Sequence, residues 1–368
     1  MKWVLQRALY GLPESPMLWN KTLVGAFKKL GYKQSTSDPC MFICNIKPKY
    51  VVVAIIVDDL LVASKREKDA DQLIKDLSAM FRIKNMDSPK YVIDIHIDYD
   101  QKKRKMRLNQ QLYIQNIDKR FGADKCKPSK TAVDPNQKLH NDMNSKPTKM
   151  PYRELIGSLI YATLTRPDIC VIVSQLSRYL ENPQEAHWKS GMRVLRFLYY
   201  TKEKSLTFIF NGQLITIEIY SDSTWNSDRD TSRSRTGYLI YLNGCLIAWK
   251  SKLQPMVTLS STEAEYVALN DAAKEGIWVR RMAGEVGHLQ ELPTTINVDN
   301  MSTIALAENQ MTKPRTKHIA MRYHWIREQI KGGNFKLAHV ASELNKADVL
   351  TKVKAQKVME DLIVFELN

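Results

Sequence analysis

The spacing of hydrophobic residues changes several times along the chain, and each change predicts a different element. Apolar runs within 38–64 are separated by turns at Lys47-Pro48-Lys49 and Asp58-Asp59, which predicts three strands. A helical spacing follows from Lys65 to Phe81. The stretch 90–108 has β-strand character and leads into a basic helical region. The first part of the chain is therefore expected to combine a small sheet with helices.

The middle of the chain predicts a helical block behind a linker. The polar segment 129–151 contains three prolines, and helical spacing then runs over 152–201 with an interruption at Arg166-Pro167-Asp168. Asn182-Pro183 predicts the cap and first turn of the last helix of the block. The apolar seam of that helix is formed by Trp188, Met192, Leu195 and Tyr199.

The last third predicts a mixed sheet with helices packed on it. Asn243-Gly244, between two apolar runs, is the strongest short signal for a β-hairpin. The predicted order is βββαβααβα, with an extra helix before the last strand. The expected elements are strands at 214–222, 237–242, 245–250, 294–300 and 335–340, and helices starting near 260, 301, 320 and 346.

Length and charge narrow the class of protein. With 368 residues, 44% of them hydrophobic, the chain is long enough for two or three domains. Its formal charge of +16 indicates a polyanionic partner, nucleic acid first and a membrane surface second. Ten Lys or Arg and two Asp in 101–130 supply half of that excess. A single basic run of this kind is also typical of a solvated surface.

The cysteines and the apolar runs indicate a cytoplasmic or nuclear protein that is not secreted. Five scattered cysteines show no paired zinc-ligand spacing, so we expect reduced thiols. Arg7 and Glu14 interrupt the start of the chain where a signal peptide needs an apolar core. The longest apolar run, 50–57, is too short to cross a bilayer. We therefore expect no membrane partner.

The stretch LSSTEAEYVALNDAAKEGIW, at 259–278, contains two glutamates that predict different environments. On a helical period Glu265 shares an apolar face with Ala268, Leu269 and Ala272, whereas Glu263 falls on a wetter face. A lone carboxylate is expensive to desolvate, so the position of Glu265 needs an explanation. Two capping boxes fit the sequence, Ser260 with Glu263 and Thr262 with Glu265. Capping and chemistry are thus alternative roles for Glu265.

Three further acidic residues fall where elements of the same sheet end or begin. Asp222 lies near the end of the first strand, Asp299 at the end of the fourth, and Asp348 at the start of the closing helix. Individually, Asp299 with Asn300 suits a helix cap, and Asp348 suits a first helical turn. Together with Glu265 they would repel one another unless cations neutralised them. An all-oxygen cluster suits two Mg²⁺ or Mn²⁺ ions, which can hydrolyse a phosphodiester.

Several basic side chains are candidate nucleic-acid contacts. Each group also fits a solvated helix face or turn, and only the surrounding positive charge favours a phosphate track. The candidates are Lys102, Lys103, Arg104, Lys105 and Arg107 in the basic run, Lys189, Arg193 and Arg196 on the last helix of the block, and Arg322, His324 and Arg327 near the end of the chain.

Long ordered motifs resemble those of copia-type LTR retrotransposon Pol polyproteins. Five segments resemble the ribonuclease H region of that family: YSDSTW, the segment around SSTEAEYVAL, VDNMSTIALAEN, RTKHIAMRYHWIRE and KADVLTK. One long segment resembles its helical tether, YRELIGSLIYATLTRPDICVIVSQLSRYLENPQEAHW. Three segments resemble the later part of its reverse transcriptase: ALYGLPESPMLWN, SDPCMF and VDDLLVAS. The resemblance covers nearly the whole chain.

The resemblance implies an α+β or α/β architecture in four parts. These are a truncated reverse-transcriptase palm and thumb over 1–130, a linker over 131–151, a helical tether over 152–205 and a ribonuclease H-like mixed sheet with flanking helices over 206–368. It places the nuclease carboxylates, which bind Mg²⁺ or Mn²⁺, on Asp222, Glu265, Asp299 and Asp348. It places the polymerase aspartates on Asp58 and Asp59, and it implies cleavage of the RNA strand of an RNA–DNA hybrid.

The chain departs from the family pattern in its polymerase part. A further metal-binding aspartate is expected before ALYGL and is not contained in this chain. Ile56 replaces the usual Tyr before the paired aspartates, Pro13-Glu14 replaces Lys-Gln, and Ile93-Asp94 replaces the Leu-Gly of a tight hairpin. These changes predict an inactive polymerase. In the nuclease part, Ala320 replaces an aspartate that the family often has.

Three functions remain open from the sequence. The chain is a metal-dependent ribonuclease H on a Pol fragment, a module that binds nucleic acid without cutting it, or an inactive relic whose palm remnant misfolds. The expected partners are an RNA–DNA hybrid or other nucleic acid and the remainder of a Pol polyprotein. Metal-dependent cutting separates the first from the second, and cooperative unfolding separates both from the third.

Overall fold

The computed structural model describes residues 9, 11–134, 139–142, 145–210, 212, 214–308, 320–352 and 365–367. The chain divides into two compact units. One combines Met1–Pro89 with Trp278–Leu289, and the other combines Lys90–Ile277 with Gln290–Asn368. Among the described residues, no helix has both the length and the apolar character that a membrane span requires.

The first unit is an antiparallel sheet covered by two helices. Its strand order is β1-β2-β3-β4, and β3 pairs with both neighbours. Alternate residues Val51, Val53 and Ile55 are buried against apolar side chains of the two helices, which include Phe27 and Leu73. The elements are α1 Ser15–Lys29, β1 Lys33–Gln34, β2 Met41–Ile46, β3 Lys49–Ile56, β4 Asp59–Ser64 and α2 Glu67–Ser78. The three predicted strands and the helix after them are confirmed.

The second unit contains an antiparallel sheet built from distant parts of the sequence. Its order is β14-β8-β7-β6-β5, and β7 pairs with β8 through Lys105↔Ile209 to Leu108↔Leu206. The strands are β5 Tyr91–Val92, β6 Ile95–Asp100, β7 Lys105–Asn109, β8 Lys204–Ile209 and β14 Phe365–Leu367. Segments separated by about a hundred residues are thus joined by backbone hydrogen bonds.

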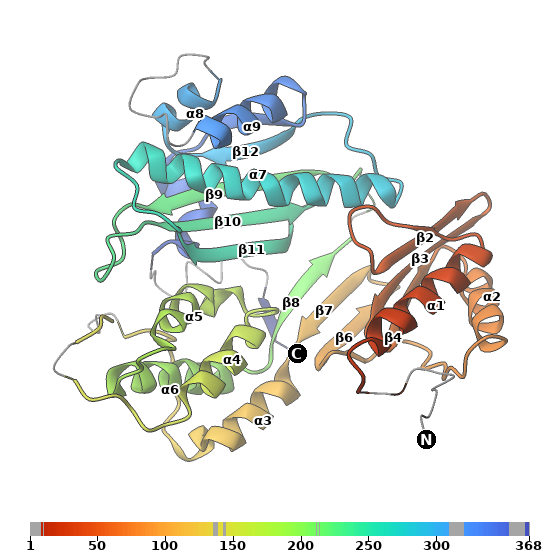
Figure 1. The fold of residues 1–368 in the computed structure, drawn as a ribbon, viewed down its shortest axis with the longest axis horizontal. Helices are drawn as coiled ribbons and strands as arrows, with labels where there is room; N and C mark the ends of the chain where they lie inside the picture. The colour runs from red at the N-terminus through yellow and green to blue at the C-terminus, as the bar shows by residue number, and fades with distance from the viewer. Residues whose placement is uncertain are drawn as a thin grey trace, which may run out of the picture. The chain divides into compact units, whose positions relative to one another are not determined.

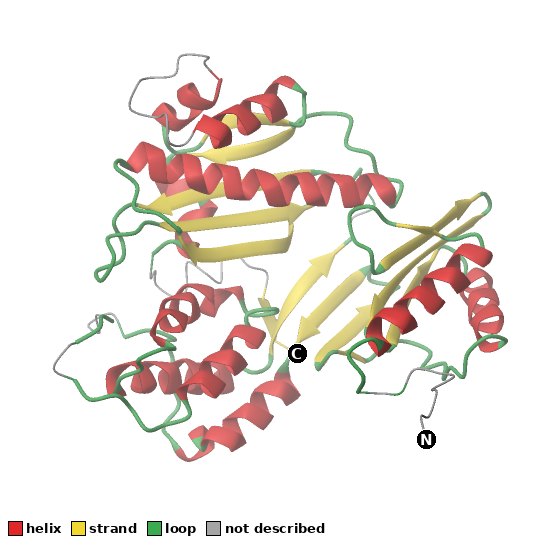
Figure 2. Cartoon of the chain, viewed as in Figure 1, coloured by secondary structure: helices red, strands yellow, loops and turns green. Residues whose placement is uncertain are grey.

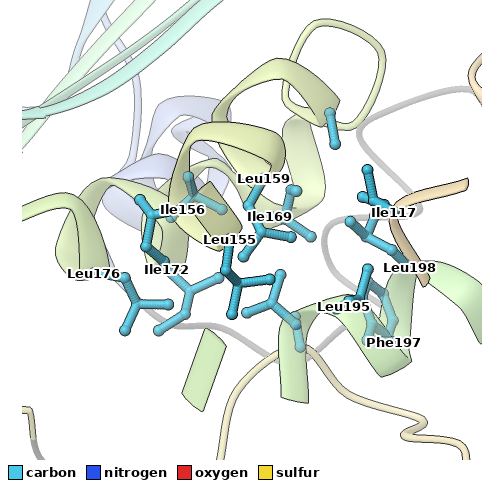
Figure 3. Packing of buried hydrophobic residues seen from close by; sticks show 14 of the residues in the cluster. Ile117, Leu155, Ile156, Leu159, Ile169, Ile172, Leu176, Leu195, Phe197 and Leu198 are labelled. Atoms are coloured by element: carbon cyan, nitrogen blue, oxygen red, sulfur yellow. The ribbon is translucent and has the colours of Figure 1, made fainter. Parts of the chain in front are cut away.

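Four helices of the second unit pack into a bundle. They are α3 Gln111–Phe121, α4 Tyr152–Ala162, α5 Cys170–Leu176 and α6 Glu185–Tyr200. Figure 3 shows Leu155 and Leu159 of α4 lying beside Ile172 of α5 and Leu195 of α6, with Ile117 of α3 at the edge of the same cluster. This core joins the helix that follows the basic run to the helical block.

The predicted start of α6 is wrong by two residues. Asn182-Pro183 was expected to cap the helix, but α6 begins at Glu185 with Gln184 as its N-cap. The Gln184 side chain accepts from the third helical residue, and the His187 ring accepts from the Gln184 backbone N–H at 3.1 Å. This reciprocal box leaves Asn182-Pro183 in the turn before the helix.

A mixed five-stranded sheet forms the last part of the second unit. Its order is β11-β10-β9-β12-β13, with β9 to β11 antiparallel and β12 and β13 parallel to β9. The predicted turn at Asn243-Gly244 is confirmed, and both residues have positive φ, as a tight hairpin requires. The strands are β9 Ile217–Thr224, β10 Arg235–Leu242, β11 Cys245–Leu253, β12 Thr294–Val298 and β13 Phe335–His339.

Helices flank this sheet in the predicted order. The long helix α7, Ser261–Glu285, lies roughly along the direction of β9, β10 and β11 (Figures 1 and 2), and it is followed by α8, Met301–Glu308, and α9, Ala320–Lys331. The closing helix expected from residue 346 is a short 3₁₀ helix, η6, over Lys346–Leu350, and the stretch 353–363 lies outside the described residues. The expected mixed α and β fold class is confirmed.

Candidate metal centre

Two parallel strands bring Asp222 and Asp299 to the same edge of the mixed sheet. The parallel pairing of β9 with β12 matches Tyr220 with Asn297. Two residues further along each strand direction lie Asp222 and Asp299, and a step of two keeps the side chain on the same face. The register of two strands therefore places two carboxylates side by side.

Glu263 caps helix α7, and Glu265 does not. The Ser260 hydroxyl accepts from the Glu263 backbone N–H at 3.2 Å, and the Glu263 carboxylate accepts from the Leu259 N–H at 2.7 Å. Of the two possible boxes, the Ser260 bond is formed, and the Glu263 carboxylate completes the cap at Leu259 rather than at the Ser260 backbone N–H. The expectation of a wetter face for Glu263 is wrong, because residues 263–270 of α7 are all buried.

Glu265 points to the strand that carries Asp222. Its Oε1 accepts from both the backbone N–H and the hydroxyl of Ser223, each at 3.0 Å. The expected apolar stripe is confirmed, since Ala268, Leu269 and Ala272 are fully buried. The helix therefore holds this carboxylate inside the protein at the end of β9.

The fourth acidic residue, Asp348, lies on the short helix η6, which is hydrogen-bonded to β9. Asn345 caps η6 and donates from its side chain to the Ser221 carbonyl at 3.0 Å. This bond fixes Asp348, which is buried, near the end of β9. Asn300 supplies the cap of α8 by accepting from Thr303 N–H at 3.0 Å, so the capping alternative falls on Asn300 rather than on Asp299.

The acidic side chains form a compact cluster. Among the described residues, Asp222, Glu265 and Asp299 form the one group of three or more potential metal ligands whose atoms lie within 4.8 Å of one another. Burial, and then the neighbouring charges of Asp299 and Asp348, raise the pKa of Asp222. Burial, followed by Asp222 and Asp299, raises the pKa of Glu265. The cluster therefore resists full ionisation while no cation is bound.

Two features of the cluster are those expected of a divalent-cation site. Glu265 Oε2 is buried and has no hydrogen-bond partner among the described residues, although Oε1 has two. The donor set consists only of carboxylate oxygens, which are the ligands that Mg²⁺ and Mn²⁺ prefer. The Lys352 ammonium lies 2.5 Å from Asp348 Oδ1, and the Thr351 hydroxyl donates to Asp222 Oδ2 at 2.5 Å.

Known proteins similar to this chain are retrotransposon polyproteins. Residues 1–135 match the family described as reverse transcriptase (RNA-dependent DNA polymerase). The chain is 35% identical over 365 residues to the Retrovirus-related Pol polyprotein from transposon TNT 1-94 of Nicotiana tabacum, a match that covers 97% of this chain and 27% of that protein. It is 33% identical over 349 residues to the Pol polyprotein from transposon RE1 of Arabidopsis thaliana, covering 95% and 24%.

The chain belongs to the copia-type retrotransposon Pol family. It spans about a quarter of the length of these two relatives. Among solved structures, the crystal structure of LC11-RNase H1 in complex with RNA/DNA hybrid aligns with 39% of this chain and 99% of that chain, with 18% identity and a TM-score of 0.29.

The polymerase aspartates expected for a Pol chain lie in an exposed hairpin. Asp58 is in the turn between β3 and β4, and Asp59 begins β4, so the turn lies one residue earlier than expected. Ile93 and Asp94 form the turn of the β5–β6 hairpin, and both have positive φ. A β-branched residue is strained in this conformation, and glycine adopts it freely.

The basic residues of the β6–β7 hairpin differ in their availability. Lys102, Lys103 and Arg104 are exposed in the turn. Arg107 lies on β7, where its Nε donates to Asp98 Oδ2 on β6 at 2.9 Å. The turn residues therefore remain candidate contacts for nucleic acid, whereas Arg107 forms an ion pair across the two strands. Lys105 begins β7 and is half-buried.

Two of the three basic residues on α6 bind the chain just before and at the start of the linker. Arg196 Nε donates to the Lys127 carbonyl at 2.7 Å, and Arg193 donates to the Thr131 hydroxyl at 2.8 Å. Lys189 is exposed. These bonds favour a structural role for Arg193 and Arg196, and Lys189 is the member of the group best placed for solvent or phosphate.

The candidate nucleic-acid contacts near the end of the chain also include one exposed residue and one that forms a structural contact. His324 is exposed on α9, whereas Arg327 is buried and donates to the Leu306 carbonyl in α8 at 2.9 Å. Arg327 therefore joins two helices. The side chains of Ala320 and Arg322 lie outside the described residues.

Sequence reasoning missed the side chains that hold the carboxylates. Ser223, Thr351 and Lys352 contact Glu265, Asp222 and Asp348, respectively. The spacing of four between Asp348 and Lys352 was a usable signal, because residues four apart meet on a helical turn. Ser223 and Thr351 carried no such signal, since their partners come from distant parts of the chain.

Proposed function

We propose that residues 206–368 act as a metal-dependent ribonuclease H that cleaves the RNA strand of RNA–DNA hybrids. The single observation that supports this most is the convergence of carboxylates from β9, α7 and the end of β12, with one buried oxygen of Glu265 left without a donor. Family membership supports the choice of substrate, because the similar proteins are Pol polyproteins.

In this proposal Asp222, Glu265, Asp299 and Asp348 hold the ions, two Mg²⁺ or two Mn²⁺. Bound ions at such a centre supply an activated water and stabilise the leaving oxygen of a phosphodiester. The chain's own residues prepare the centre. Ser223 fixes one oxygen of Glu265, and among the described residues the other, buried oxygen has no hydrogen-bond donor. The bond from Thr351 opposes the rise in the pKa of Asp222 and so favours its ionised, metal-binding form.

We also propose that the polymerase part of this chain does not synthesise DNA. Asp58 and Asp59 are exposed, and among the described residues no third metal ligand gathers with them. The strained hairpin at Ile93-Asp94 replaces a turn that is tight in the family. In a cell the chain is expected to meet its hybrid in the cytoplasm or nucleus, with the remainder of a Pol polyprotein as a second partner.

The test is a cleavage assay on the full chain. An end-labelled RNA–DNA hybrid is incubated with Mg²⁺, with Mn²⁺ or with chelator, next to the variants Asp222→Asn and Glu265→Gln. We expect metal-dependent cutting of the RNA strand, reduced at least about a hundredfold in both variants, since each removes a ligand charge. Glu263→Gln is the matched control, because glutamine also serves in a capping box and Glu263 lies outside the cluster.

Two other outcomes of this assay would argue against the proposed function. A folded protein that binds the hybrid with unchanged affinity in chelator and never cuts it would be a binding module. Loss of cutting in Glu263→Gln to the same extent as in Glu265→Gln would show that helix integrity, rather than a ligand, was being tested.

A further inference from the structure

A cavity of about 260 Å³ in the second unit is unusually rich in arginine. It lies against α5 and α6 and against the loop that follows β9. Four arginines and two aspartates line it, together with smaller polar and apolar residues. The charged residues are Arg178, Arg193, Arg229, Arg235, Asp134 and Asp228. The lining therefore carries two more positive than negative groups.

The two aspartates are matched with arginines other than Arg235. Asp228 uses Oδ1 to accept from the backbone N–H and the hydroxyl of Thr231, at 2.9 and 2.7 Å, and its Oδ2 forms an ion pair with Arg178. Asp134 lies 3.7 Å from the Arg193 guanidinium. A third carboxylate, Asp230, lies 3.8 Å from the Arg178 guanidinium, and among the described residues none of the three forms an ion pair with Arg229 or Arg235.

Within the part of the chain that the structure describes, the buried cation Arg235 has only neutral hydrogen-bond partners. Its side chain begins on β10, is 2% exposed, and donates to the hydroxyls of Ser174 at 2.8 Å and Ser251 at 3.4 Å. Burial and then the charge of Arg178 lower the pKa of Arg235 to about 10, so it still carries its charge at neutral pH. A buried guanidinium without a counter-ion is costly, and a second one nearby adds repulsion.

We propose that this cavity binds a phosphoryl group, with Arg235 as its buried anchor and Arg178 and Arg229 beside it. The planar guanidinium donates two parallel hydrogen bonds to phosphate oxygens, and it discriminates against ligands without paired acceptors. A phosphate anion offsets the charges of Arg235 and Arg229, which form no ion pair with a described carboxylate, and its oxygens can serve more than one arginine. Arg229 lines the cavity and is exposed, so it can also contact the solvent-facing part of a larger ligand.

The phosphoryl group has two possible sources, and both use the same chemistry. One source is the terminal phosphate of a nucleic-acid strand, and the other is a free mononucleotide or inorganic phosphate. The proposal holds whether or not the carboxylate cluster cuts nucleic acid, because Arg235 and its partners are not members of that cluster.

The test measures binding of inorganic phosphate to the full chain in the presence of chelator and at constant ionic strength. Titration calorimetry should show one site, and phosphate should raise the melting temperature more than chloride does. Arg235→Met should weaken phosphate binding at least about tenfold, because it removes the buried donor. In phosphate-free buffer the same variant should be as stable as the original chain or more so, since an uncompensated buried charge is gone.

Two further variants keep the test decisive if Arg235→Met fails to fold. Arg229→Gln changes an exposed residue at the cavity and should weaken phosphate binding about threefold or more. Arg281→Gln changes an exposed arginine that does not line the cavity and should leave binding unchanged. Phosphate binding that is absent, or equal in all variants, would overturn the proposal.

Oligonucleotides separate the two sources. A DNA strand with a 5′-phosphate should bind more tightly than the same strand with a 5′-hydroxyl, and the difference should disappear in Arg235→Met, if the source is a strand end. Binding of adenosine monophosphate and inorganic phosphate, without any preference between the two strands, would assign the site to free phosphates.

Discussion

At the scale of single residues, two glutamates on one helical turn have different roles because their neighbours differ. The Glu263 carboxylate accepts a hydrogen bond from the Leu259 backbone N–H and so caps the N-terminus of α7. Glu265 lies two residues later, which turns it toward Ser223 on β9 and toward the other carboxylates. The sequence identified both residues, but it left open which of two serine or threonine positions formed the cap. That choice depends on where the chain leaves the preceding loop.

The raised carboxyl pKa values predict how stability depends on pH in the absence of metal. Because the pKa of Asp222 and that of Glu265 are raised in the folded state, the folded chain holds more protons than the unfolded chain above about pH 4. Folding stability from these groups therefore falls as pH rises from that point through their folded pKa values. Melting temperatures measured in chelator from pH 5 to pH 8.5 check this.

Glu265→Gln isolates the contribution of the cluster. The variant should melt at a higher temperature than the original chain at pH 8 in chelator, by about 2 °C or more, and the gap should narrow at pH 5. Added Mg²⁺ should stabilise the original chain increasingly with pH and should stabilise the variant much less. A gap that stays constant with pH would contradict a raised pKa at this position.

At the scale of elements, hydrophobic periodicity predicted many of the strands and helices of both units, but it missed α1, β1, β8 and β14, and element ends were less accurate. The hairpin at Asn243-Gly244 was predictable because its turn chemistry is local. The start of α6 was not, because Gln184 and His187 form a cap from residues with weak capping preference. Contacts such as Asn345 with Ser221 were also not predictable, since they join residues far apart in sequence.

Gly237 controls the distance between β10 and the turn that carries Asp348. A Cβ at this position would lie 2.7 Å from Thr351 Cγ2 and 3.0 Å from the Ala347 carbonyl oxygen, which belongs to the backbone. Gly237→Ala should therefore push η6 away from the sheet, destabilise the fold by about 1–3 kcal/mol and weaken Mg²⁺ binding. Thermal unfolding with and without Mg²⁺ measures both effects.

Gly157→Ala is the matched control for Gly237→Ala. Gly157 lies inside α4, and a Cβ there would meet no atom within 4 Å. This substitution should leave stability unchanged or raise it by up to about 1 kcal/mol, because alanine favours helix more than glycine does. Equal behaviour of the two variants would show that the close approach at Gly237 has no energetic effect.

At the scale of the whole molecule, the second unit is held together by contacts between segments that precede the linker and segments that follow it. β7 pairs with β8, and Ile114 and Ile117 of α3 belong to the same core as α4 and α6. The basic run and the helical block therefore belong to one packed structure, although a polar segment separates them in the sequence.

This packing predicts the result of a single cut in the linker. Lys149 is exposed, so limited trypsin treatment is expected to cleave after it. The two pieces should elute together in size-exclusion chromatography and separate only in denaturant, because burying the shared core outweighs the lost covalent link. Pieces that elute separately without denaturant would contradict this expectation.

The pairing of β7 with β8 also determines what a proteolytic cut between these two strands would do. A protease that cuts the chain between these strands would break the polypeptide, but the two fragments would stay associated. The four residue pairs from Lys105↔Ile209 to Leu108↔Leu206 would still hold them together. Two bands on a denaturing gel would then come from one complex of two fragments. Cleavage and release are separate events in such a chain, and release would require the strand pair itself to open.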